Sequence, residues 1–307
     1  MGLTNGKYIS KAPLLYNRLM IVYAKNLPPF LNPLIFLWAT LLSIGATAAL
    51  AQCHDEAITF TTEKTNTSPI RLFLDTPRTI EAIVTIDCKS LDNLKPSQPL
   101  PYTFIVNSLF NHREVLRLVQ MDHRQLWRYG AYSYHFVHGI PSNLPTVDYI
   151  YSLPYAGDSF LVGQSYYGRH SHFAGSPEQY AVDFNMPEGT PIRAARPGTV
   201  IAYRDDSSAG GDAAAFAECC NYIHIKHDDG TYAVYAHLRP RGVCVRLGQV
   251  VNKGTVIGYA GSTGWASCPH LHFMVYRVLN TVKIESVPFR MQTSEGILNQ
   301  LLEGHTY

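Results

Sequence analysis

The 307-residue sequence contains few charged residues, since Asp, Glu, Lys and Arg make up only 16% of it while hydrophobic residues make up 46%. Average soluble proteins carry about 25% charged residues, so this composition argues against a disordered chain, a coiled coil or a basic nucleic-acid-binding arm. At about 150 residues per domain, the length allows two domains with adequate cores. We therefore expect two globular domains and no nucleic-acid partner.

Several motifs of well-known enzyme and metal-site classes are also missing. The sequence has no GxxxxGK[ST] phosphate loop, no GxSxG nucleophile elbow and no CxxC pair. These absences argue against a P-loop nucleotide site, an α/β-hydrolase and a cysteine-rich zinc finger. After residue 51, only the short terminal segment of residues 295–302 has apolar residues at the spacing of a helix. We therefore predict a mainly β protein with a short helix in this segment.

Acidic residues are absent from the first 51 residues, which contain four basic ones. The remaining chain carries 21 basic and 23 acidic residues, so the formal net charge changes from +2 to −2 without this segment. Residues 34–51 are uncharged and end in Ala49, Leu50 and Ala51, which is typical of a secretory signal. An uncleaved membrane anchor is the alternative. We interpret residues 1–51 as a signal peptide or N-terminal membrane anchor, and expect export to the periplasm or cell envelope, with possible attachment to the inner membrane.

Six cysteines follow the exported segment. An even number of cysteines in an oxidising compartment favours disulfides over metal thiolates. The predicted bridges are Cys53–Cys88 and a second one from Cys219 or Cys220 to Cys244 or Cys268.

Residues 52–150 alternate apolar and polar positions in short runs, for example at residues 69–74 and 81–86. Short strands separated by turns predict an antiparallel, Ig-like β-sandwich. An aromatic cluster at alternating positions is compatible with core packing or with a carbohydrate-stacking surface. Its members are Trp127, Tyr129, Tyr132, Tyr134 and Phe136.

Residues 151–280 contain short Val/Ile/Tyr-rich strands separated by glycines, and residues 281–307 are expected to form a C-terminal tail. Within residues 268–276, His270 and His272 are two positions apart, so in a strand both side chains lie on one face. Such a pair suits one metal ligand and one acid/base group. Asp183 lies between apolar neighbours, where a buried carboxylate needs a cation or several hydrogen-bond donors. His237 is another polar residue in an apolar strand.

Four segments in order carry a resemblance to a known family: SH…YAVDFxxPxGTPIxAAR, DGTYAVYAHL, VxKGTVIGYAGSTG and PHLHF. They resemble the lysostaphin/LytM-type zinc endopeptidases, which cleave peptide bridges in bacterial cell walls. The resemblance covers roughly residues 150–280 and implies a LytM-type antiparallel β-sheet peptidase domain. Residues 151–155 and 164–168 look similar to a subgroup with a β-sandwich ahead of the peptidase domain.

The resemblance implies a zinc site with His172, Asp183 and His272 as ligands and with His237 and His270 as the catalytic pair. Many family members have the first ligand four residues before the aspartate, and that position is Gln179 here. The subgroup that the chain resembles has a longer spacer after Ser-His, which implies His172 as the first ligand, with His170 as the alternative.

The functional hypothesis is an exported zinc metalloendopeptidase that hydrolyses stem-peptide cross-links of peptidoglycan with a zinc-bound water. The alternative is a non-catalytic LytM-like regulator or wall-binding protein that activates another hydrolase. Further expectations concern the surroundings of the site: Tyr235, Tyr259, Asn221 and residues 258–264 could frame the groove, and His224 and His227 are expected on the sheet surface. The first domain could bind substrate, cover the groove or dock a partner.

Overall fold

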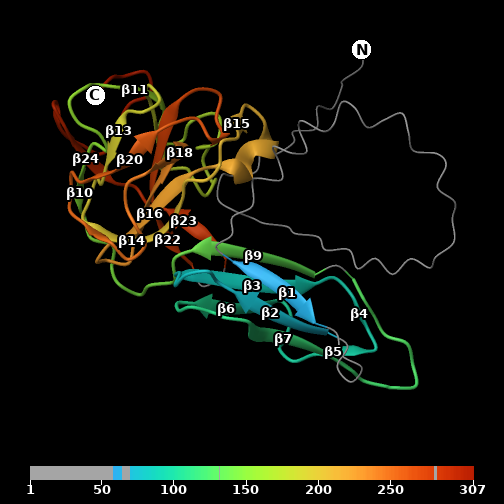
Figure 1. Cartoon of the computed structure of the whole chain (residues 1–307). Coiled ribbons are helices and arrows are strands. Elements are labelled where there is room, and N and C mark those ends of the chain that lie inside the picture. Colours follow the sequence, from blue (N-terminus) through green and yellow to red (C-terminus); the bar gives the residue numbers. More distant parts are fainter. Residues whose placement is uncertain (1–57, 64–69, 131, 280–281) are drawn as a thin grey trace, which may run out of the picture.

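The computed structural model describes residues 58–63, 70–130, 132–279 and 282–307, so the predicted signal or anchor lies outside the described residues. Strands dominate, and the one helix in these ranges is a short 3-10 helix, η1 (Ala214–Cys219). The prediction of a mainly β protein is confirmed. The strands form two groups, one early in the chain and one late (Figure 1). No helix in the described ranges has the length and apolar character needed to cross a membrane.

The first group is a two-sheet sandwich. One sheet has the order β1 (Thr59–Glu63), β2 (Ile70–Asp75), β7 (Arg113–Gln120) and β5 (Leu94–Pro96), and the other has the order β6 (Tyr102–Val106), β3 (Ala82–Cys88) and β9 (Tyr132–His138). A short pair, β4 (Leu91–Asp92) and β8 (Arg128–Tyr129), lies beside them. Alternate residues of these strands fill one core, which agrees with the period of two read from the sequence.

The aromatic cluster of the sandwich belongs to this core. Tyr134 and Phe136 are buried, and Trp127, Tyr129 and Tyr132 pack against the same cluster while partly buried. Burying a large apolar side chain contributes about 1.5–3 kcal/mol to folding, so these rings serve the stability of the sandwich. Of the two interpretations of the aromatic pattern, core packing is the one that the structure supports.

The second group is built on a large antiparallel sheet. Its order is β11 (Leu161–Gln164), β12 (Val182–Asn185), β22 (His270–Val278), β17 (Tyr232–Ala236), β16 (Tyr222–Lys226), β14 (Gly198–Arg204) and β19 (Val250–Val251), with β23 (Ile284–Ser286) paired to β22. Smaller sheets flank it: β13 (Pro191–Arg193), β20 (Val256–Ala260) and β18 (Leu238–Val243); β10 (Ile150–Ser152), β24 (Arg290–Thr293) and β25 (Gly296–Leu298); and β15 (Gly210–Gly211) with β21 (Gly264–Trp265).

The two faces of the large sheet have different neighbours. Odd-numbered residues of β22, such as Phe273, enter the core shared with the small sheets. Even-numbered residues, such as Tyr276, pack in a cluster that includes Val137 of the sandwich. The Tyr276 hydroxyl donates to the carbonyl of His138 at 3.1 Å. The sandwich therefore packs on the same sheet face that carries His272.

The C-terminal residues contain strands rather than a helix. The expected helix at residues 295–302 is wrong, because β25 pairs with β24 in a hairpin whose turn includes Gly296 at φ +110°. Strand β24 in turn pairs in parallel with β10. Leu301 and Tyr307 are buried in the core of the second group of strands, so residues 282–307 pack closely onto that group.

The cysteine predictions are also wrong. Cys88, Cys220, Cys244 and Cys268 carry free thiols, so neither predicted bridge is formed. Cys219 is disulfide-bonded, but not to Cys244 or Cys268. The parity of the cysteine count says nothing about which residues meet in space.

Candidate metal centre and active site

Three neighbouring strands place polar side chains in one row. Asp183 of β12 lies directly opposite His272 of β22 in the ladder. On the other side of β12, a register shift between Val162 and Gln164 sets Gln164 of β11 opposite Asp183. Opposite residues in antiparallel strands project to the same face, so these three side chains lie side by side on the sheet.

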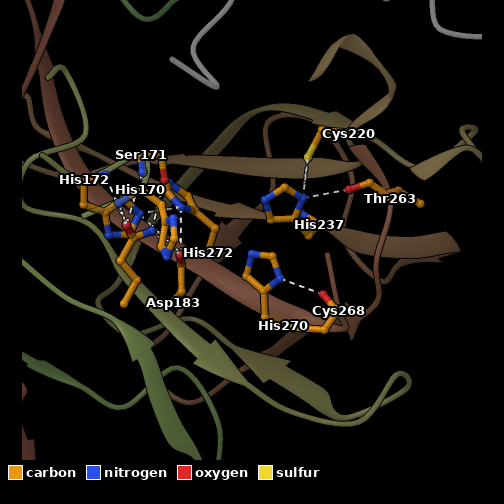
Figure 2. A network of polar contacts seen from close by, with 11 residues as sticks. His170, Ser171, His172, Asp183, Cys220, His237, Thr263, Cys268, His270 and His272 are labelled. Atoms are coloured by element: carbon orange, nitrogen blue, oxygen red, sulfur yellow. Dashed lines mark hydrogen bonds and ion pairs between the residues drawn. The ribbon is translucent and has the colours of Figure 1, made fainter. Parts of the chain in front are cut away.

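His172 joins this row from the loop that precedes β12. Its Nε2 atom lies 3.4 Å from Nδ1 of His272 and 3.5 Å from Oδ1 of Asp183. Nδ1 of His272 is 2.9 Å from the same carboxylate oxygen. The three side chains can each direct one ligand atom to a common point, with all three atoms within 4.8 Å of one another (Figure 2). The structure thus brings together the three residues expected as metal ligands.

His170, the alternative first ligand, and Gln179, at the usual position of that ligand in the family, both lie outside this triad. His170 lines the adjacent cavity, and its backbone N–H donates to Gln164 rather than to the triad. Gln179, at the position four residues before Asp183, accepts hydrogen bonds from Gly175 and Tyr167 within its own loop. The first-ligand position is therefore filled by His172, which a longer spacer separates from Asp183, and not by residue 179, which lies four residues before Asp183.

Burial and charge act against each other in the triad. Burial alone would raise the pKa of Asp183, but the imidazoles of His172 and His272 outweigh it and hold that pKa well below its usual value. Burial lowers the pKa of His172 to about 4. Burial also acts to lower the pKa of His272, but its contact with Asp183 leaves that pKa raised. The carboxylate is therefore an anion held among nitrogen donors, which is the charge state a metal ligand requires.

His237 and His270 form a second pair of imidazoles beside the triad. Their ring centroids are 4.4 Å apart, and the centroid of His237 is 6.1 Å from that of His272 (Figure 2). Nδ1 of His237 lies 2.7 Å from the carbonyl oxygen of Thr263, and Nδ1 of His270 lies 2.9 Å from that of Cys268. A carbonyl only accepts, so both rings carry their proton on Nδ1 and keep a lone pair on Nε2.

The environment of His237 favours its neutral form. The side chain is fully buried, and its Nε2 has no hydrogen-bond partner. Burial, followed by the nearby His270 and His272, holds the pKa of His237 well below its ordinary value. A neutral imidazole with an unpartnered nitrogen is suited to accept a proton.

The backbone at His237 explains how this residue reaches the site. In β17, Ala236 lies opposite His272 on the site face, so strict alternation would turn His237 to the opposite face. His237 instead has φ +64°, in the left-handed region, and its ring lies beside His270 and His272. Tyr235 keeps the alternation and is buried in the opposite core, where its hydroxyl accepts from the Ala195 N–H. Tyr235 is therefore not a groove-wall residue, contrary to expectation.

A cavity of about 380 Å³ opens beside Asp183 and the imidazole pair. Asp183, His237 and His270 line it, as do several residues that the sequence did not indicate: Gly163, Gln164, Asn185, Asp212, Trp265, Ala266 and Ser267. The lining does not include Asn221, Tyr259 or the rest of residues 258–264, which were expected to frame the groove. Asn221 instead donates to the carbonyls of Ser207 and Leu238, and so it holds the loops behind His237.

Two further histidine predictions are wrong. His224 and His227 were expected on the sheet surface, but both are buried. Nδ1 of His224 contacts the Tyr276 hydroxyl at 2.7 Å, and Nδ1 of His227 contacts the Pro197 carbonyl at 2.8 Å. His224 therefore packs on the sheet face that meets the sandwich, and His227 packs against Tyr151 on the opposite side.

The triad fits a divalent metal ion such as zinc. Two imidazole nitrogens face each other at 3.4 Å across a carboxylate, although at most one of them can donate to the other, and a shared cation suits that arrangement. Two histidines and one carboxylate are a donor set of catalytic zinc sites, which leave a further position open. Fold and site together define a mainly β protein with a His/Asp/His cluster that could hold a metal ion.

Comparison with known proteins gives the family of this domain. Residues 177–285 match the model of Peptidase family M23, and this part of the chain is an M23 peptidase domain. His172 lies just ahead of the matched segment, whereas Asp183, His237, His270 and His272 lie within it. The family explains why the four sequence segments occur in order.

Individual relatives match the same part of the chain. Lysostaphin of Staphylococcus staphylolyticus is 33% identical over 120 residues, covering 38% of this chain and 23% of lysostaphin. The peptidoglycan DD-endopeptidase ShyA of Vibrio cholerae is 36% identical over 91 residues, covering 30% of this chain and 18% of ShyA. The chain thus spans about a quarter or less of the length of these two relatives. A catalytic-domain structure of the M23 protein EnpA of Enterococcus faecalis is 27% identical, with a TM-score of 0.33, covering 44% of this chain and 92% of that one.

Proposed function

We propose that the protein is a zinc metalloendopeptidase that hydrolyses peptide bonds of bacterial peptidoglycan. His172, Asp183 and His272 would hold the zinc, and His237 and His270 would be the catalytic pair. The observation that carries the proposal is the placement of two imidazoles beside the triad, both lining a cavity of about 380 Å³ and both with Nδ1 bonded to a backbone carbonyl. A regulator that only binds the wall would need no such pair.

Zinc held by three N/O ligands supplies Lewis-acid polarisation of a carbonyl and a water whose pKa is near 7. The imidazoles of this chain handle the protons. Nε2 of His237 or of His270 can accept a proton from the attacking water and return it to the leaving amine. The other ring, when it carries a proton on Nε2 as well as on Nδ1, can donate to the oxygen that becomes negative as the carbonyl is attacked. The fixed Nδ1–H bonds to Thr263 and Cys268 aim both Nε2 atoms without further reorganisation.

The relatives support the proposed substrate, and the composition of the first 51 residues supports the proposed location. The name of ShyA, a peptidoglycan DD-endopeptidase, supports peptidoglycan stem-peptide cross-links as the substrate class. Peptidoglycan lies outside the cytoplasmic membrane, so the signal-like or anchor-like segment fits the same function. We therefore propose an exported enzyme of the periplasm or cell envelope.

The test is incubation of the purified protein with peptidoglycan sacculi, with and without a chelator, followed by chromatography of the released muropeptides. We expect new muropeptides that disappear with the chelator and return on zinc addition. As a control, Asp183→Asn should abolish both zinc content and cleavage. Bound zinc without any cleavage would favour the non-catalytic regulator, and absence of both zinc and cleavage would refute the metalloendopeptidase.

A further inference from the structure

Gln164 is the side chain that links the first and second metal ligands. It is 6% exposed and lies at the end of β11, in the row with Asp183 and His272. Its Nε2 donates to Oδ2 of Asp183 at 3.0 Å and to Oγ of Ser171 at 3.1 Å. The Asp183 oxygen that receives this bond is the one that does not contact His172 or His272.

The other end of the same amide holds the loop that carries His172. Oε1 of Gln164 accepts from three consecutive backbone N–H groups, those of His170, Ser171 and His172, at 2.9, 3.2 and 3.5 Å. A loop without strand pairing has no ladder of its own to satisfy these donors. One side chain therefore fixes the backbone at His172 and, at the same time, the orientation of the Asp183 carboxylate.

Two local features serve this position of Gln164. The register shift in β11 makes Gly163 an extra residue, and without it Gln164 would lie opposite Val182 and face the other side of the sheet. A Cβ atom on Gly163 would come within 2.5 Å of Asn185, and one on Gly168 would clash with Cγ of Gln164. The bulge and the two glycines together allow the glutamine to reach both ligands.

We propose that Gln164 is a positioning residue that compensates for the long spacer between His172 and Asp183. With a four-residue spacer, the first ligand would be tied to the second by the chain itself, whereas here eleven positions separate them. The amide of Gln164 replaces that covalent constraint by two sets of hydrogen bonds. This inference rests on the proposed metal site, and it makes Gln164 an outer-shell determinant of zinc affinity.

The experiment measures zinc affinity of the full chain by competition with a chromogenic chelator. Removing an outer-shell partner typically weakens metal binding about 10- to 100-fold, and we expect a loss of that size for both Gln164→Ala and Gln164→Met. The alanine variant lets water enter from the cavity to satisfy the loop amides, whereas the methionine variant keeps the volume. The matched control is Ser165→Ala, since the adjacent Ser165 is equally buried and its hydroxyl donates to the Leu301 carbonyl, away from the ligands.

Ser165→Ala should bind zinc as the parent does. Hydrogen exchange of the metal-free protein is the second readout, in which the amides of residues 170–172 should exchange faster in the Gln164 variants alone. Parental zinc affinity and unchanged exchange in both Gln164 variants would refute the positioning role while leaving the proposed function intact. Failure of the parent protein itself to bind zinc would refute the proposed function, and with it this inference.

Discussion

Replacing His237 with asparagine removes the imidazole Nε2 from the candidate active site and keeps a hydrogen-bond donor near the place of Nδ1. The Nδ2 of asparagine lies near the place of the imidazole Nδ1, so it can still donate to the Thr263 carbonyl that now receives that bond at 2.7 Å. Asparagine also tolerates the left-handed backbone that His237 adopts at φ +64°. What the variant lacks is Nε2, the nitrogen without a hydrogen-bond partner.

The expected loss follows from the role of that nitrogen. General acid/base help is typically worth about 10²- to 10⁴-fold in rate, which corresponds to about 3–5 kcal/mol of activation free energy. His237 is not among the three residues that converge on the metal position, so His237→Asn should keep its zinc. The free energy of unfolding should fall by about 0.5–3 kcal/mol, as for most substitutions of buried residues.

The matched control is His227→Asn. His227 is also buried, its Nδ1 also donates to a backbone carbonyl, and its Nε2 also lacks a partner, but it does not line the cavity. Muropeptide release and zinc content would be measured for both variants. Turnover of His237→Asn within a few-fold of the His227→Asn control would show that Nε2 takes no part in the reaction. Loss of zinc from His237→Asn would show that the residue belongs to the metal site instead.

Three more predictions concern ligands, pH and thiols. His172→Ala should lose zinc while His170→Ala retains it, as metal analysis of the purified variants would show; the reverse result would move the first ligand to His170. Burial lowers the pKa of His227 to about 4. As the pH falls below about 6.5, the unfolded chain therefore binds a proton at this residue before the folded chain does. Between pH 6.5 and 4, this residue should reduce the free energy of unfolding by about 3 kcal/mol. Urea unfolding across this range should show a loss about 3 kcal/mol smaller in His227→Asn than in the parent, since the other buried histidines contribute to the loss in both proteins. Equal pH dependence of the two proteins would contradict the assignment. Alkylation of the native protein should modify the exposed Cys268 but not Cys220, which is buried and whose pKa burial raises to about 12. Because Cys268 lines the cavity, its modification should block cleavage. Undiminished cleavage after full labelling of Cys268 would disprove this block.

The sequence predicted the histidine face of the site because that face depends only on local geometry. His270 and His272 are two residues apart in β22, and a strand places such residues on one side wherever it lies in the sheet. The mainly β class followed in the same way from short strands and frequent turns. The resemblance to a family then supplied Asp183, His172 and His237, which the structure brings to the same region.

Other features depend on register or on single backbone angles, which a pattern of residues does not determine. Gln164 faces Asp183 only because of a bulge in β11. Tyr235 and His237 are two residues apart, as His270 and His272 are, but the left-handed φ of His237 places them on opposite faces. The free thiols illustrate the same limit, since disulfide pairing depends on distances between segments far apart in the chain.

The position of the sandwich bears on its three possible roles. Even-numbered residues of β22 run from His270 and His272 at the cavity to Met274 and Tyr276 under the sandwich, so one sheet face serves both. The contact is held by apolar packing and by an ion pair of 2.8 Å between Lys226 and Glu81. Among the described residues, none of the sandwich lines the cavity. A covering role for this part of the sandwich would require it to leave the sheet and expose Tyr276, which is 1% exposed. In its present position the described sandwich supports the inner end of the sheet, and none of its described residues covers the cavity at the histidine end.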